Sequence, residues 1–285
     1  ITVAIAAPLT PIFNLNMGVS GAAIATVISQ AVSCFYVVIF LLGKRVYVRI
    51  TFGNYSFRIM KRVLYFGLSP FIIIATDSII VIALNSVLQK YGGTQNGDML
   101  ITCATIVQSY MQLITMPMLG ITGGTQSILS FNYGAKNIER IKQGVKCILV
   151  LCISFTVVMF ILSQVVPHFF VLIFTQNIQY IHLSAWGIKV FTSGIIILAF
   201  QYTFVDGLTG LGVSKVALSL SLFRKAVFLL FILILPVYLG AKGSFYAEPI
   251  ADITGGIVST IVFSLTIKKV LRKREEMADT EQLYG

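Results

Sequence analysis

Residues 145–166 read VKCILVLCISFTVVMFILSQVV, and after Lys146 this stretch holds no charged side chain. A helix needs roughly 20 predominantly apolar residues to cross the hydrocarbon core of a bilayer. The stretch is long enough for one crossing. It therefore predicts a transmembrane helix. The rest of the chain can be searched for stretches of similar length and apolar character.

Six further stretches meet the same criterion, so the sequence predicts an all-α integral membrane protein with about seven transmembrane helices. One of them, 99–131, is too long for a single straight span and contains Pro117 followed by Gly120, Gly123 and Gly124. We expect a kink or break there. The six stretches are 21–42, 63–89, 99–131, 183–209, 216–239 and 244–267.

The composition of the whole chain excludes an ordinary soluble protein. Of 285 residues, 57% are hydrophobic and 11% are charged, whereas soluble domains carry about 25% charged residues. The mean hydropathy is +0.91. So few charges cannot cover a surface that faces water, and the apolar excess must face lipid.

The net charge of +11 does not indicate nucleic-acid binding, because the basic residues lie between the apolar stretches and not on one soluble face. Lys and Arg concentrate in the cytoplasmic loops of membrane proteins. The protein is predicted to lie in the plasma membrane of the cell. The basic loops predict that its C-terminus is on the cytoplasmic side. They contain Lys44, Arg45, Arg49, Arg58, Lys61, Arg62, Lys136, Arg140, Lys142, Lys146, Lys215, Lys268, Lys269, Arg272, Lys273 and Arg274.

Catalytic and metal-binding motifs are not evident. The sequence has neither HExxH nor GxSxG, and His168 and His182 are expected to flank a loop at the membrane surface. None of the four cysteines is spaced from another Cys or His as in a zinc site. We therefore expect neither an enzyme nor a bound cofactor, with Cys34, Cys103, Cys147 and Cys152 serving as small packing residues.

The domain organisation follows from the longest basic connection. Residues 44–62 separate one helix from the remaining six and are predicted to be a cytoplasmic link between two bundles. Residues 63–271 would form a six-helix bundle, and residues 272–285 a cytoplasmic tail with a frayed helix end followed by disorder. The chain begins with Ile1 and shows no cleavable signal peptide, so we expect the numbering to start inside a longer protein.

Four segments resemble the multidrug and toxic compound extrusion (MATE) family, and in particular its MepA-like branch. They are MGVSGAAIATVISQ (17–30), GLSPFIIIATDS (67–78), GITGGTQSILSFNYGAKNIERIK (120–142) and AEPIAD (247–252). The resemblance covers much of the chain in the right order. Near the start, where the family often shows an LDPIF-like stretch, this chain has Thr10 in the place of the acid.

The resemblance implies a twelve-helix, two-bundle transporter that works by alternating access. It would export amphipathic, often cationic, drugs in exchange for protons or sodium ions. This chain would supply the tail of helix five and helix six within residues 1–43, and then the C-terminal bundle. Helices one to four, which complete the N-terminal bundle, would be its partner, together with the lipid bilayer.

Asp77 is the strongest candidate for coupling, because it lies near the middle of an apolar span where an ionised carboxylate costs about 2.5 to 3.5 kcal/mol. Either it binds a proton or cation in a water-accessible cavity, or it is a structural carboxylate bonded to a neighbouring helix. The family resemblance supports the first interpretation, since acids on helix seven of related transporters are implicated in coupling.

Glu248 and Asp252 lie four residues apart and share one face of a helix. Arg224 and Lys225 are about ten residues into the preceding helix, roughly 15 Å deep, which brings them near the depth of Asp252 and Asp77. We predict a charge network that serves either coupling or architecture. Asp206, close to the end of its helix, is expected to be a surface carboxylate.

The drug path is predicted to carry both polar and adaptable apolar side chains. Helix-to-helix hydrogen bonding is the alternative role for the glutamines. A lipid-linked precursor flippase or a nontransporting scaffold subunit stays open as an alternative function. A strongly cationic cavity would indicate the flippase, and a solid, dry bundle the scaffold. The candidate lining residues are Gln108, Tyr110, Met111, Gln112, Gln201 and Tyr202.

Overall fold

The computed structural model describes residues 18–43, 53 and 56–284. The predicted tail of helix five, the departure at Thr10 and most of the 44–62 link therefore lie outside the described residues. The chain divides into two compact units, Ile1–Met60 and Lys61–Gly285. In the first unit the described structure is mainly helix α2, Gly18–Leu42, which contains the predicted spanning stretch 21–42, and the first residues of α3, which begins at Phe57.

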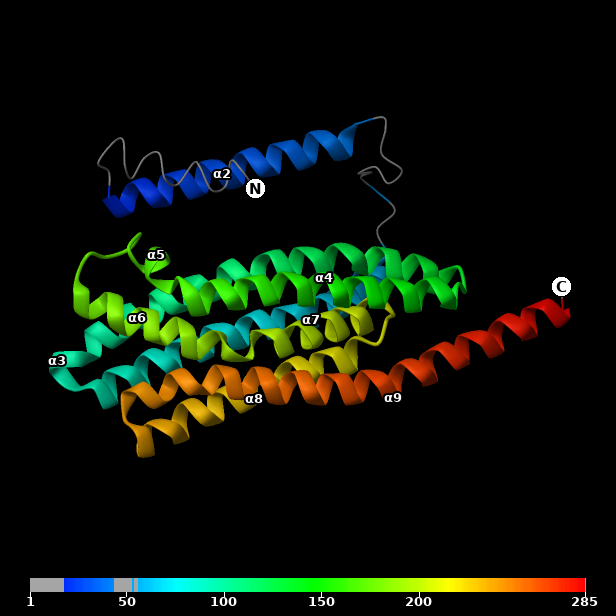
Figure 1. Ribbon diagram of the computed structural model, residues 1–285. Helices are drawn as coiled ribbons and strands as arrows, with labels where there is room; N and C mark the ends of the chain where they lie inside the picture. Colours follow the sequence, from blue (N-terminus) through cyan, green and yellow to red (C-terminus); the bar gives the residue numbers. More distant parts are fainter. Residues whose placement is uncertain (1–17, 44–52, 54–55, 285) are drawn as a thin grey trace. The chain divides into compact units, whose positions relative to one another are not determined.

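The second unit is a bundle of long helices, and strands are absent from the residues that the structure describes. Helix α7 lies against α4, α8 and α9, which run alongside it in Figure 1. The elements are α3 (Phe57–Gly134), α4 (Ile138–Val165), α5 (Pro167–Val171), α6 (Ile178–Phe191), η1 (Thr192–Gly194), α7 (Ile195–Gly210), α8 (Ser214–Leu239), η2 (Ala241–Tyr246) and α9 (Ala247–Tyr284).

Six helical segments in the described part of the chain are long and apolar enough to cross a membrane. They confirm the all-α membrane fold, and within α2 the residues Gln30–Leu42 form a further, shorter apolar helix. The chain is a multi-pass membrane protein. The six segments are Phe71–Gly93, Asn96–Gly134, Ile138–Val165, Ile178–Gly210, Ser214–Leu239 and Ala241–Arg272.

The reversal inside α3 occurs at Gly93, the residue in that helix whose backbone is not helical, with φ of 68° and ψ of −172°. Glycine tolerates this positive φ because it has no Cβ. Of the kink or break that we predicted near Pro117, a break is not found, because the backbone stays helical from there to Gly134. In lipid an unpaired backbone group has no water partner, which favours an unbroken helix even around proline.

The predicted disorder after residue 272 is also wrong for the backbone, because α9 continues to Tyr284. The charged run is rich in Lys, Arg, Glu and Ala, all good helix formers. It extends a helix that the bundle already nucleates, and extension costs far less than nucleation.

The interior of the bundle is apolar, and so is much of its outer surface. Leu88, Ile114 and Ile195 are fully buried at 0% exposure, whereas Val165 and Leu265 are each 70% exposed on outward faces. A water-soluble protein would not present so many large apolar side chains. The pattern fits a bundle whose outer face contacts lipid.

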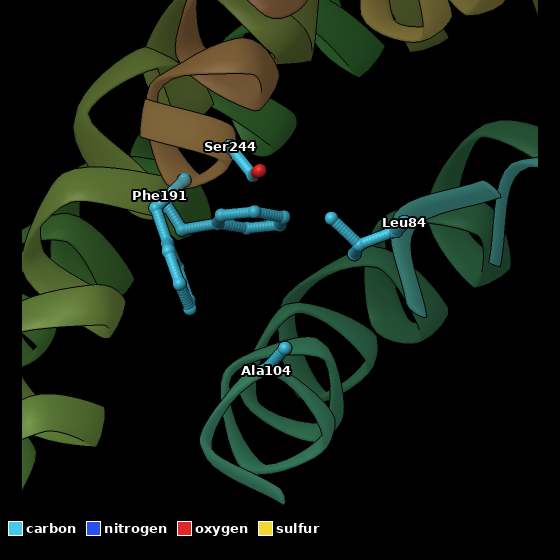
Figure 2. Close-up of a pocket in the computed structure, with 5 residues that line it drawn as sticks. Leu84, Ala104, Phe191 and Ser244 are labelled. Atoms are coloured by element: carbon cyan, nitrogen blue, oxygen red, sulfur yellow. The ribbon is translucent and has the colours of Figure 1, made fainter. Parts of the chain in front are cut away.

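A small pocket lies where α3, α6 and η2 meet (Figure 2), lined by Leu84, Ala104, Phe191, Ser244 and Phe245. It has no room for a water molecule, which is the least that a ligand site needs. We interpret it as a packing defect in the core and not as a binding site.

Candidate functional site

A cavity of about 690 Å³ opens between α3, α7 and α8, near the end of the bundle where α7 connects to α8. Its wall combines apolar side chains with carboxylate, amide, hydroxyl and basic groups. The size and the mixture are typical of small-molecule sites. The lining residues are Ile73, Ile74, Asp77, Leu119, Gln126, Gln201, Tyr202, Val205, Asp206, Thr209, Gly212, Ser214, Ala217, Leu218, Ser221, Arg224 and Lys225.

Asp77 lines this cavity and forms an ion pair with Lys225, whose Nζ lies 2.6 Å from Asp77 Oδ1. The two partners differ in access, since the side chain of Asp77 is 58% exposed and that of Lys225 is 5% exposed. The Lys225 ammonium also donates to the backbone carbonyl of Ile73 on α3. Lys225 therefore reaches across from α8 and holds a carboxylate that faces open space.

Arg224 points to a different helix. Its Nη1 lies 3.1 Å from Glu248 Oε1 and 3.0 Å from Asp252 Oδ1, both on α9. The side chain of Asp252 has no exposure and that of Glu248 is 12% exposed. The predicted network thus exists as two groups, one between α8 and α3 and one between α8 and α9.

The local sequence explains this split. Consecutive helix residues are about 100° apart, so Arg224 and Lys225 must face different neighbours. Glycines make room for the buried group: a Cβ at Gly194 would lie 2.9 Å from Asp252 Cβ, and one at Gly255 would lie 2.9 Å from Arg224 Cγ. Close packing of α7, α8 and α9 around these charges thus depends on positions without side chains.

Asp206 was predicted to be a surface carboxylate, and this is wrong. It lines the cavity and accepts a hydrogen bond from the Thr122 hydroxyl, with Gln126 as a further partner. Its helix ends only at Gly210, and the cavity lies at this end of the bundle. The sequence signal that could have identified Asp206 is the pair of polar residues Thr122 and Gln126, which lie one helical turn apart on a neighbouring apolar span.

The predicted drug-path residues separate into two places. Gln201 and Tyr202 line the cavity. Tyr110 and Met111 lie in the core at 5% and 6% exposure, where the Tyr110 ring packs edge-on against Phe170 at 4.9 Å. Both side chains belong to the apolar core cluster of the bundle, and neither lines the cavity. Gln108 is partly buried and Gln112 is exposed, and neither lines the cavity.

Metal and thiol chemistry find no support in the described residues. They contain no group of three or more His, Cys, Asp or Glu side chains that could hold a metal ion. Cys34, Cys103, Cys147 and Cys152 are free thiols. His168 and His182, which lie on α5 and α6, pack edge to face with ring centroids 6.2 Å apart.

A bundle of membrane-spanning helices around a charged, open cavity is the architecture of a membrane transporter. The sequence profile of the MatE family matches residues 74–235, more than half of the chain. The chain therefore belongs to the MatE family, as the resemblance of its four segments predicted. Members of this family are transporters rather than enzymes.

Relatives and solved structures agree with this assignment. The chain is 22% identical over 258 residues to the multidrug export protein MepA of Staphylococcus haemolyticus, covering 89% of this chain and 56% of MepA. A MATE crystal structure in complex with MaL6 superposes with a TM-score of 0.81 at 22% identity, covering 95% of this chain and 61% of that one. An outward-facing multidrug resistance MATE transporter gives 0.80 at 24%, with the same coverage. The chain spans about three fifths of the length of these proteins.

Proposed function

We propose that this chain is the C-terminal part of a two-bundle multidrug efflux antiporter. It would export amphipathic, often cationic, compounds in exchange for protons or sodium ions. The observation that carries the proposal is the open cavity with Asp77 and Asp206 on its wall. A scaffold subunit would need only a dry bundle, and the cavity argues against that alternative.

The charges of the cavity favour organic cations over anionic lipid-linked precursors. Arg224 is bonded to two carboxylates of α9, and Lys225 is bonded to Asp77. The wall itself carries Asp77, Asp206, Arg224 and Lys225, and because both bases are bonded to other carboxylates, Asp206 leaves one negative charge in excess when it is ionised. An excess of negative charge attracts cations and repels phosphate groups.

Coupling is assigned to Asp77, with Glu248, Asp252 and Arg224 as the neighbouring group. A carboxylate in a membrane is costly unless it is paired or hydrated, and Asp77 has both forms of support, because Lys225 bonds it and its side chain is largely exposed. A proton or sodium ion arriving at Asp77 would compete with Lys225. Such competition would change the packing of α3 against α8. In the proposed mechanism, this change drives alternating access.

The test is Asp77→Asn in the complete transporter, reconstituted in proteoliposomes with an imposed ion gradient. We expect gradient-driven export to be abolished while folding is kept, because an amide cannot exchange a charge. Asp98→Asn is the matched control, since Asp98 is an exposed acid on the same helix near its reversal. Unchanged export by Asp77→Asn would defeat the assignment of Asp77 and not the membership of the family.

The remaining bundle and the orientation are part of the same proposal. Half of the cavity wall would come from an N-terminal bundle, so we expect the isolated chain to show no vectorial export. Cysteines placed at Lys136 and Lys268 should react with an impermeant thiol reagent from the cytoplasmic face only. Reaction from opposite faces would overturn the proposed topology, including a cytoplasmic C-terminus in the plasma membrane.

A further inference from the structure

Asp252 on α9 carries an oxygen that its surroundings leave unsatisfied. Its Oδ1 accepts a hydrogen bond from Arg224, but no described residue donates one to Oδ2. The side chain has no exposure, so bulk water does not reach this oxygen. A buried, ionised carboxylate oxygen without a donor is strongly disfavoured.

Helix α7, which packs against α9, carries a second unsatisfied acceptor. Gln201 is 4% exposed, and its Oε1 is likewise buried without a donor among the described residues. A Cβ added at Gly255 would clash with both Gln201 Oε1 and Arg224 Cγ, and Gly255 follows Asp252 by three residues and so shares its helix face. The two orphaned oxygens therefore belong to the same small space between α7, α8 and α9.

One hydrogen atom would satisfy both oxygens. A protonated carboxyl group is a donor as well as an acceptor, whereas a carboxylate and an amide oxygen only accept. The charges agree with this, since Glu248 and Asp252 share the single Nη1 of Arg224. One cation between two carboxylates leaves one negative charge uncompensated in a buried place.

We propose that Asp252 is a proton-binding residue, whose carboxyl group donates its proton from Oδ2 to Gln201 Oε1. The proton has a way out, because Gln201 and Arg224 also line the cavity. On release, the proton passes to water in the cavity, and Asp252 keeps its bond to Arg224. This site is separate from Asp77, which pairs with Lys225.

The pH response of this site depends on all the charged or titratable groups around it. Glu248 and Arg224 are the charged groups bonded within this cluster. Only the use of this proton in export rests on the proposed function, because the protonation itself is a property of the bundle. The further groups that act on this cluster are Tyr202 and Asp206 on α7, Lys225 on α8 and Asp77 on α3.

Infrared spectroscopy of the purified complete transporter at neutral pH tests the proposal, because a protonated carboxyl group has its own carbonyl band. We expect the band in the unaltered protein and in Asp77→Asn, and its loss in Asp252→Asn. The asparagine amide donates to Gln201 as the carboxyl group would, so this variant should fold. Glu248→Gln, on the same helix face, should weaken the band, because Arg224 then compensates Asp252 alone. Asp98→Asn, at an exposed acid, is the control that should keep it.

Gln201→Leu supplies an independent test if Asp252→Asn fails to fold. Removal of the acceptor should move the carboxyl band to higher frequency, because the carboxyl group loses the hydrogen bond that it donates. A band that is absent from the unaltered protein, or unchanged in both variants, would overturn the proposal. In that case the Gln201 amide is turned so that its nitrogen donates to an ionised Asp252. Neither result depends on whether Asp77→Asn exports.

Discussion

Two adjacent basic residues of α8 hold two carboxylate groups in opposite environments. Lys225 pairs with Asp77, whose side chain is 58% exposed to the cavity, and Arg224 pairs with Asp252, which has no exposure. An ion pair at an exposed carboxylate contributes little to stability, whereas a buried one becomes costly when one partner is lost. The comparison indicates that the ion pair between Asp77 and Lys225 can break and re-form, whereas the bonds of Arg224 to Glu248 and Asp252 hold α8 to α9.

The largest effect on stability is expected from Arg224→Met. It leaves Glu248 and Asp252 without their cation, and loss of one partner of a buried ion pair costs about 3 to 5 kcal/mol. We expect the yield of folded protein and its thermal midpoint in detergent to fall sharply. Removal of the second charge in Arg224→Met with Glu248→Gln should restore part of the loss, and strictly additive losses would show that the two residues do not interact.

A smaller loss is expected from Gly256→Ala, which tests the packing that surrounds the buried group. The new Cβ would lie 2.5 Å from the backbone oxygen of Ile197 on α7, and such overpacking costs about 1 to 3 kcal/mol. Gly207→Ala is the matched control, because its Cβ would meet Phe263 on α9 at an ordinary 3.6 Å. Equal thermal midpoints for the two variants would contradict close packing of α7 on α9 at Gly256.

The smallest effect is expected from Lys225→Met. Asp77 keeps its access to the cavity and can be hydrated there, so the loss should stay within about 1 kcal/mol, as for exposed ion pairs. The thermal midpoint of this variant should lie close to that of the unaltered protein. A loss as large as that of Arg224→Met would remove the contrast between the two groups.

Much of the fold could be predicted from the sequence, because each helix must be apolar over a length fixed by the bilayer. The stretch 145–166 corresponds to the end of α4, Ile138–Val165, and 216–239 to α8, Ser214–Leu239. Of the kink or break expected at Pro117, the break was wrong, because helix-breaking propensity counts for less where the backbone has no water to bond.

The candidate site could be predicted only in part. Asp77, Asp252 and Glu248 were found from the sequence, because acids within apolar spans are rare. The sequence could not show which acid each base of α8 would bond, since that depends on how the helices are rotated. Asp206 was missed because distance from a helix end does not reveal a cavity, and Tyr110 was assigned to a cavity although its helix face packs into the core.

Accessibility of position 77 tests the central claim most directly. After Cys34, Cys103, Cys147 and Cys152 are replaced by alanine, Asp77→Cys should react with an impermeant thiol reagent from the face on which exposed Lys215→Cys reacts. Fully buried Met118→Cys should stay unreactive. Absence of reaction at position 77 from either face, with Lys215→Cys reacting normally, would contradict a water-accessible carboxylate in this bundle.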